Sequence, residues 1–206
     1  MKVLLLGANG RTGRLVMNQA IAMGHDVSVL VRHVGLSFPI GVRVIPGDAL
    51  DAERVQYAMH LQDAVIVCIG GNAPWMNQTL EREAMQNIVS AMKKSVTGLL
   101  LVVSAMGVAE SAKQSPWWYR YLLVPTFLRG ITADKTAMEA IVRESGLDWI
   151  ISRPPVLTDG NVTGEVRVLV KGEVGHMITR ADLAMWLVEQ LESRVYVGQA
   201  VVVVNS

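Results

Sequence analysis

A glycine-rich heptapeptide near the N-terminus has the composition and spacing of a phosphate-binding loop. The apolar run 3–6 continues directly into Gly7-Ala8-Asn9-Gly10-Arg11-Thr12-Gly13, and a helical pattern follows. In this G-x-x-G-x-x-G spacing, the first glycine allows a tight turn, the second lets the backbone approach a pyrophosphate, and the third lets helix and strand pack closely. The N–H groups at the start of the helix would face the anion. The pattern predicts a dinucleotide site, and the alternative is a merely tight strand-to-helix turn.

The end of the second apolar run indicates which dinucleotide would bind. This run ends in Leu30-Val31-Arg32-His33. An NAD site usually has an acidic residue here for the ribose hydroxyls, whereas an arginine suits a 2′-phosphate. Arg11 would add a second positive contact, and the lack of an acid argues against S-adenosylmethionine. The sequence therefore favours NADPH, with a solvated strand end as the alternative for Arg32.

Two further segments follow apolar runs and are candidates for the same site. Asp48 comes after the third run, where it would accept a hydrogen bond from the adenine amine or serve as a helix N-cap; both readings stay open. Cys68-Ile69-Gly70-Gly71 comes after the fourth run. Glycines at that place allow the backbone to lie close to a ribose.

Ser104 and a nearby aromatic segment are candidates for the reacting end of the site. Ser104 ends the fifth apolar run, where its hydroxyl would bond a carboxamide or an acceptor, or satisfy a loop N–H. In residues 116–121, Trp117 and Trp118 would form walls for a flat acceptor. Arg120 or Arg129 would pair with a phosphate or carboxylates of that acceptor. The aromatic segment would otherwise be a core-facing helix or a dimer surface.

The elements that must position these residues alternate along the chain. Short runs rich in Val, Ile and Leu occupy 3–6, 27–31, 42–45, 64–69, 99–103, 149–151 and 201–204. Helical patterns occupy about 11–24, 51–60, 77–95, 131–145 and 180–193. This alternation predicts an α/β fold of the Rossmann type, a doubly wound parallel sheet forming a single domain over 1–206. The irregular segments 105–130 and 155–178 are candidates for lids on the substrate side.

The composition excludes several classes of protein. The 206 residues include 19 Lys and Arg and 18 Asp and Glu, so the net charge of +1 argues against a nucleic-acid partner. Cys68 is the only cysteine and the four histidines have no metal-ligand spacing, so we expect no metal site. Apolar runs fall short of a bilayer span. We expect a soluble, cytoplasmic protein without a membrane partner, monomeric or a weak homo-oligomer.

Several motifs together resemble a known family. They are GANGRTG at the N-terminus, VLVR in the second run, GD after the third, VSA at 103–105, RESGLDWIISRPP at 143–155 and ITRADLA at 178–184. The chain resembles the atypical short-chain dehydrogenase/reductases over nearly its whole length. Within them it is most similar to the NAD(P)H-binding flavin reductase and biliverdin-IXβ reductase group.

The resemblance implies a role for each matching position. Arg32 would bind the 2′-phosphate, Asp48 would lie on the adenine side, and Ser104 would lie beside the nicotinamide. The remaining positions form three sets: a pyrophosphate loop of Gly7, Asn9, Gly10, Arg11, Thr12 and Gly13; a ribose border of Ile69 and Gly70; and a nicotinamide wall of Pro154, Pro155 and Val156.

Two departures from the family pattern bear on the reaction. Members of the wider superfamily use a Tyr-x-x-x-Lys pair as proton donor, but here Ile131 stands four residues before Lys135. Biliverdin-IXβ reductases carry a histidine after the two prolines, where this chain has Val156. The first departure argues against ketone reduction and is compatible with hydride transfer to a flavin or bilin, whose proton can come from solvent.

The sequence therefore predicts an NADPH-dependent reductase of a planar conjugated acceptor, a flavin such as FMN as substrate or a bilin such as biliverdin. A non-catalytic NADP(H) sensor or assembly protein of the NmrA-like kind is the alternative, because such a protein also needs no proton donor. A reductase or epimerase of small carbonyl compounds is the third possibility.

Overall fold

The computed structural model describes residues 1–33, 37–70, 79–114, 121–122, 126, 128–170 and 172–205. The strands of the main sheet are β1 (Lys2–Leu6), β2 (Asp26–Val31), β3 (Arg43–Pro46), β4 (Ala64–Val67), β5 (Leu99–Val103), β6 (Asp148–Ser152) and β10 (Gln199–Val201). They are ordered β10-β6-β5-β4-β1-β2-β3, and every neighbouring pair is parallel. This is the predicted Rossmann-type α/β sheet.

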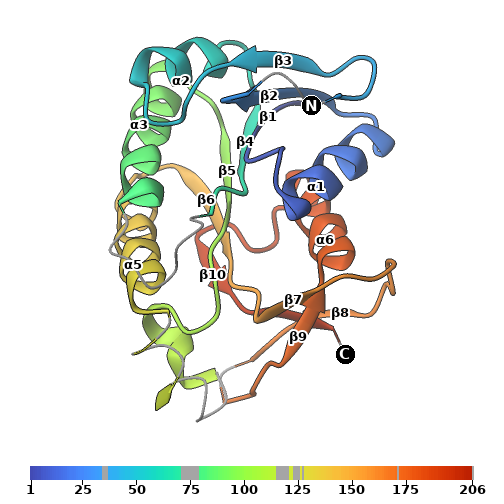
Figure 1. Ribbon diagram of the computed structural model, residues 1–206, viewed down its shortest axis with the longest axis vertical. Helices are drawn as coiled ribbons and strands as arrows, with labels where there is room; N and C mark the ends of the chain where they lie inside the picture. Colours follow the sequence, from blue (N-terminus) through green and yellow to red (C-terminus); the bar gives the residue numbers. More distant parts are fainter. Residues whose placement is uncertain are drawn as a thin grey trace.

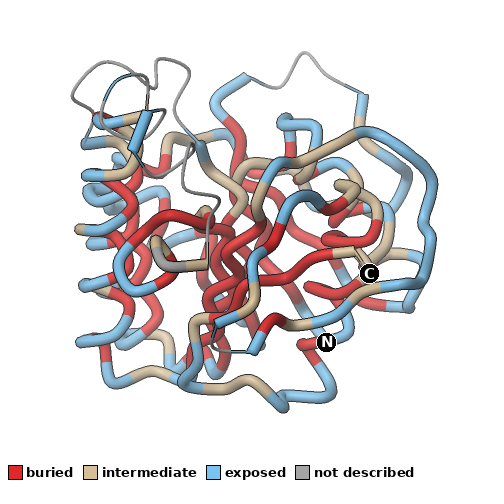
Figure 2. Tube along the Cα trace, turned by 90° about the horizontal axis from the view of Figure 1, so that it is seen from below, coloured by how far each residue is buried: buried red, intermediate tan, exposed pale blue. Residues whose placement is uncertain are grey.

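Helices cover both faces of this sheet (Figure 1). The helices are α1 (Arg11–Ala22), α2 (Ala52–Met59), α3 (Leu80–Ser95), α5 (Arg129–Arg143) and α6 (Arg180–Ser193), and a short 3-10 helix, η1, spans Ala109–Gln114. One core lies between the sheet and the pair α1 and α6, and the other lies between the sheet and α2, α3 and α5. Figure 2 shows the buried trace running through the centre of the molecule, with exposed segments around it.

The strand sequences are continuous apolar runs because each strand is buried on both faces. In β5, Leu99, Leu101 and Val103 belong to the core beneath α1 and α6. The intervening Leu100 and Val102 belong to the core beneath α3 and α5. A strand covered on one face only would alternate with polar residues, as these strands do not.

The last apolar run departs from the prediction. We predicted one strand over 201–204, but the chain forms β10 in the main sheet and then β11 (Val203–Asn205) in another. β11 pairs antiparallel with β8 (Val166–Val168). Between the two strands, the carbonyl oxygen of Val202 accepts from the N–H of Leu169, so the chain changes partners without leaving this group unpaired.

The region after β6 contains short strands that the sequence pattern did not reveal. β7 (Val156–Thr158) and β9 (Met177–Thr179) pair in parallel, with Val156 opposite Met177. Both residues are about half exposed, whereas Ile178, which follows Met177 in β9, is buried. The pair therefore presents an apolar outer face, which we call the β7–β9 face, defined by Val156 and Met177. Within the described residues, no helix has the length and apolarity to cross a membrane.

A side-chain carboxylate of α5 caps the N-terminus of α3. Thr79, the N-cap of α3, makes no side-chain cap bond. Instead Asp134 of α5 accepts hydrogen bonds from the backbone N–H groups of Glu81, at 2.9 Å, and Arg82, at 3.1 Å. A buried carboxylate from another helix thus replaces the local cap and fixes the spacing of α3 and α5.

Asp182, at the start of α6, holds the C-terminal segments together. It is fully buried, and its carboxylate accepts from Thr163, Gly164, Thr179 and Asn205 at 2.7–3.1 Å. Burial opposes the charge, but the hydrogen bonds outweigh burial and lower the pKa of Asp182 to about 2. The ITRADLA motif is therefore a structural junction between α6, the loop after β7, and β11.

We expect Asp182→Asn to lower the free energy of unfolding by about 2 kcal/mol, because an amide turns a donor toward groups that are themselves donors. The matched control is Asp26→Asn, which removes an exposed carboxylate and should change it by less than about 0.5 kcal/mol. Urea denaturation measures both. Because the folded pKa of Asp182 is depressed, its contribution should be complete above about pH 4 and fade as the pH falls toward 2. A constant difference between wild type and variant over that range would contradict this account.

Candidate functional site: a dinucleotide cavity at the carboxyl edge of the sheet

A cavity of about 360 Å³ opens where the strand order reverses, between β1 and β4. The segment after β1 leads to α1 on one face, and the segment after β4 leads toward α3 on the other. Ligands of open α/β sheets bind in the crevice at such a switch point. The lining residues come from the ends of β1 to β4 and the start of α3: Leu6, Gly7, Ala8, Asn9, Gly10, Leu30, Val31, Arg32, His33, Gly47, Asp48, Ala49, Cys68, Ile69, Gly70 and Leu80.

The glycine loop fits a pyrophosphate because side chains would block its backbone. Gly7 has φ +89°, and a Cβ there would lie 2.4 Å from the carbonyl oxygen of Cys68. A Cβ on Gly13 would lie 2.2 Å from the carbonyl oxygen of Gly7. Gly10 lines the cavity and is the N-cap of α1, where it supplies no side-chain cap bond to the first N–H groups of the helix. The residues therefore suit an anion at this helix terminus.

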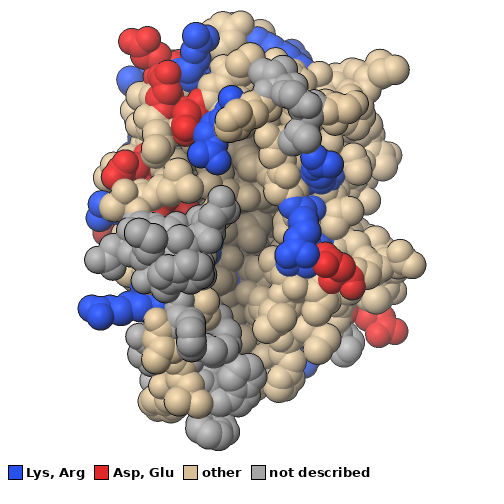
Figure 3. Space-filling model, viewed as in Figure 1, with Lys and Arg blue, Asp and Glu red and all other residues tan. Residues whose placement is uncertain are grey.

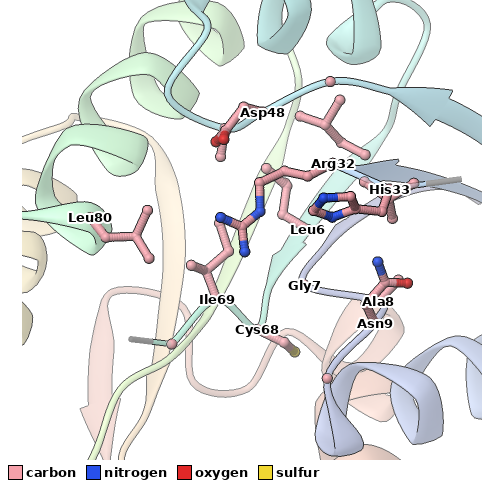
Figure 4. Close-up of a pocket in the computed structure, with 16 residues that line it drawn as sticks. Leu6, Gly7, Ala8, Asn9, Arg32, His33, Asp48, Cys68, Ile69 and Leu80 are labelled. Carbon is pink, nitrogen blue, oxygen red and sulfur yellow. The ribbon is translucent and has the colours of Figure 1, made fainter. Parts of the chain in front are cut away.

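Arg32, at the end of β2, brings a positive charge to the lining of the cavity. Figure 4 shows its guanidinium extending between Asp48 and Ile69, with His33 on the side of Ala8 and Asn9. An arginine at the end of β2 fits a 2′-phosphate and offers nothing to accept from ribose hydroxyls. His33 also lines the cavity, a position that the sequence analysis missed although it directly follows Arg32.

The two readings of Asp48 are now distinguishable in part. The N-cap of α2 is Asp51, whose Oδ1 accepts from the N–H groups of Glu53 and Arg54. Asp48 accepts from the N–H of Leu50 at 3.1 Å in the preceding turn and lines the cavity. It is therefore not the cap of this helix, and the contact with an adenine amine stays a prediction for a residue that lines the cavity.

Ile69 and Gly70 line the cavity as expected, beside Cys68. Burial raises the pKa of the Cys68 thiol to about 12, an effect that the positive charge of Lys135 only partly opposes. The thiol is therefore protonated at neutral pH and is not a nucleophile. The backbone of Cys68 has a structural role, because its carbonyl oxygen lies where a side chain on Gly7 would be.

Other predicted site residues lie outside the cavity lining. Arg11 is mostly exposed and pairs with Asp159 at 2.9 Å, and Asp159 also pairs with Arg180 at 2.7 Å. Thr12 belongs to the first turn of α1. Pro154, Pro155 and Val156 follow β6, with increasing exposure along the three. Of the predicted acceptor residues, Arg129 is exposed at the first position of α5, while Trp117, Trp118 and Arg120 lie outside the described residues.

Ser104 belongs to a buried polar network at the ends of β5 and β6. Its hydroxyl donates to Glu139 Oε1 at 2.6 Å. The same carboxylate accepts from Arg153, whose side chain is 1% exposed, through Nε at 3.0 Å and through a second guanidinium nitrogen. Arg153 also pairs with Glu110 of η1 at 3.0 Å. The hydrogen bond from Arg153 lowers the pKa of Glu110 to about 2.

Lys135 lies on the buried face of α5 but is bound to another residue. Its ammonium group donates to Glu81 Oε2 at 2.6 Å, and both side chains are buried. Ile131 lies one turn earlier on the same helix and is half-buried. The region of α5 that carries the proton donor in tyrosine-dependent relatives therefore presents an apolar side chain and a paired lysine. Among the described residues, no group of His, Cys, Asp and Glu side chains is arranged to hold a metal ion.

Figure 3 shows a hollow running down the middle of one face, with Lys and Arg side chains along it. Positive charge beside a cleft suits a ligand that carries phosphates.

Comparison with known proteins agrees with this geometry. A sequence model of a family described as NAD(P)H-binding matches residues 7–194. This chain belongs to the NAD(P)H-binding family. Relatives include the UPF0659 protein YMR090W of Saccharomyces cerevisiae, 28% identical with 93% of this chain and 87% of that protein covered, and YwnB of Bacillus subtilis, 26% identical with 93% and 92% covered.

Solved structures of related fold cover the whole chain. ChuY, an anaerobillin reductase from Escherichia coli O157:H7, matches with a TM-score of 0.83 at 24% identity, covering 100% of this chain and 97% of ChuY. A short-chain dehydrogenase/reductase from Veillonella parvula in complex with NADP matches with a TM-score of 0.84 at 15% identity, covering 99% and 94%. The fold of this family member is that of the atypical short-chain oxidoreductases.

We expect Arg32→Glu to weaken NADPH binding roughly 100-fold, because it replaces a charge-assisted pair by repulsion of the 2′-phosphate. NADH has no such phosphate, so its dissociation constant should change by less than about 3-fold. Fluorescence titration with both cofactors measures the ratio. Arg14→Glu reverses an exposed charge on α1 outside this cavity and is the control for long-range electrostatics. Equal losses for both cofactors would show that Arg32 does not select the 2′-phosphate.

Proposed function

We propose that this protein is an NADPH-dependent reductase that delivers hydride to a planar conjugated acceptor, a flavin such as FMN or a bilin. The observation that carries the proposal is that α5 offers, at the tyrosine and lysine positions of the superfamily, no free side chain that could donate a proton to a substrate. Ile131 replaces the proton donor and Lys135 is paired with Glu81. An acceptor that can take its proton from solvent needs no such donor, whereas a ketone does.

The cofactor half of the proposal rests on the cavity. The glycine loop and the N-terminus of α1 would hold the pyrophosphate, and Arg32 would hold the 2′-phosphate. When bound, NADPH supplies a hydride, which is a proton with two electrons, and the reduced acceptor gains one further proton from water. The protein contributes binding, orientation and exclusion of water.

The acceptor half rests on the β7–β9 face. Val156 and Met177 are paired across the two strands and remain 50% and 53% exposed, directly after the Pro154–Pro155 segment. An exposed apolar surface of this kind suits the face of a flat ring system. The likeness to ChuY over the whole chain supports a bilin as one acceptor to test, and Arg129 would meet anionic groups of either acceptor.

NADPH oxidation followed anaerobically with FMN, riboflavin and biliverdin isomers tests the proposal. We expect turnover of at least one acceptor and a preference for NADPH over NADH. Tight NADPH binding with no turnover of any acceptor would refute the reductase and favour the sensor or assembly protein. Turnover of small ketones instead would refute the role assigned to α5.

A charge placed on the β7–β9 face should impair the acceptor step selectively. We expect Met177→Glu to lower kcat/KM for the acceptor about 10-fold or more, since a carboxylate would be desolvated against an apolar ring. The dissociation constant of NADPH should stay within about 3-fold. Val162→Glu introduces the same charge at a position with a similar exposed fraction, 50% against 53% for Met177, and serves as the control. Equal effects of the two substitutions would exclude this face as the acceptor site.

A further inference from the structure

The hydroxyl of Ser104 has a defined hydrogen-bond direction. A serine hydroxyl has one proton, and that of Ser104 is committed to Glu139 Oε1 at 2.6 Å. Glu139 is 1% exposed and also accepts two N–H groups of Arg153. In all three of these contacts the Glu139 carboxylate is the acceptor. Toward a ligand, the Ser104 oxygen can therefore act only as a hydrogen-bond acceptor.

Arg153 holds the Glu139 carboxylate in the position where it accepts from Ser104. Burial works against its charge, but the hydrogen bonds that it donates to Glu139 and Glu110 outweigh that effect and raise the pKa of the guanidinium. Arg153 thus joins α5 and η1 to the end of β6. Rotation of the Glu139 carboxylate away from Ser104 would leave a buried positive charge poorly paired, which costs several kcal/mol in proteins.

Ser104 lies at the same carboxyl edge of the sheet as the cofactor cavity, one strand away from its lining. In the β4–β5 register Val67 pairs with Val102, so Ser104 is level with Ile69, which lines the cavity. Leu100 and Val102 face the α3 and α5 side, and Ser104 continues that alternation. Ser104 is therefore on the face of the sheet that α5 covers, next in register to a residue of the cavity lining.

We propose that Glu139, fixed by Arg153, is a positioning residue that makes Ser104 an acceptor for the carboxamide N–H₂ of the nicotinamide. The inference rests on the proposed function and deepens it, because it assigns Ser104 to cofactor orientation rather than to proton donation. The proton that completes reduction then comes from solvent. Hydride transfer depends on which ring carbon faces the acceptor, and a single directed hydrogen bond to the carboxamide fixes that orientation.

A cofactor analogue without N–H groups isolates this contact. The analogue is 3-acetylpyridine adenine dinucleotide phosphate, in which an acetyl group replaces the carboxamide. Calorimetric titration gives dissociation constants for NADP⁺ and for this analogue. We expect wild type to bind NADP⁺ roughly 5- to 10-fold more tightly than the analogue, the value of one well-placed hydrogen bond.

Two substitutions should remove that preference. In Ser104→Ala the acceptor is lost while the Glu139–Arg153 pair stays intact. In Glu139→Asp the carboxylate keeps its charge for Arg153 but is one methylene shorter, so it no longer reaches Ser104 and the hydroxyl proton is free to turn toward the cofactor. In both variants the ratio of the two dissociation constants should fall to about 1–2. If Glu139→Asp does not fold, Glu139→Met tests the same link, since it keeps the length of the side chain but removes the acceptor of the Ser104 proton.

Ser152→Ala is the matched control, because Ser152 is a buried serine at the end of the neighbouring strand that donates to the carbonyl oxygen of Val102. Its ratio should equal that of wild type. A wild-type ratio in Ser104→Ala would overturn the proposal. A loss in Ser104→Ala alone, with the Glu139 variants unchanged, would overturn the role of Glu139. Failure of wild type to bind NADP⁺ would instead overturn the proposed function.

Discussion

Three stretches of backbone must meet without a side chain between them for this fold to make a cofactor cavity. The end of β1, the end of β4 and the first turn of α1 converge on Gly7, whose missing Cβ leaves room for the carbonyl group of Cys68. Gly13 is required by the same contact, since its own Cβ would strike the carbonyl oxygen of Gly7. Close approach of these segments places the N-terminus of α1 at the switch point of the sheet, so that helix dipole, free N–H groups and Arg32 act on one ligand.

The other half of the carboxyl edge depends on buried charge. Arg153 and Glu139 satisfy one another, and through Glu110 and Ser104 they bind η1, α5 and the ends of β5 and β6 into one network. Removing one member of such a network strongly destabilises the fold, because the partner that remains is buried without a compensating hydrogen bond. A fully satisfied network of this kind holds the ends of these elements rigidly.

The carboxyl edge of the sheet therefore has two different parts. Glycines and Arg32 line the cavity at the switch point, while Ile131 of α5 and the β7–β9 face are apolar. Lys135, on the same helix as Ile131, neutralises Glu81 in the core. A buried lysine with this partner contributes to packing of α3 on α5 and is not free to act on a substrate.

The sequence by itself determined the elements of the fold and the residues of the glycine loop. The strand and helix order, the glycine loop and the basic end of β2 follow from periodicity and from residues with strict backbone requirements, and Gly7, Arg32, Asp48 and Ile69, which the sequence assigns to a cofactor, all line one cavity. The hydrogen-bond partners of the buried polar groups could not be predicted from the sequence. Nothing near Asp134 in the chain indicates that it caps α3, nothing near Ser104 indicates Glu139, and the run 201–204 gives no sign that it divides between two sheets. Periodicity and turn residues act over a few positions, whereas the partner of a buried charge depends on which distant elements the sheet order brings together, and only the tertiary structure decides that.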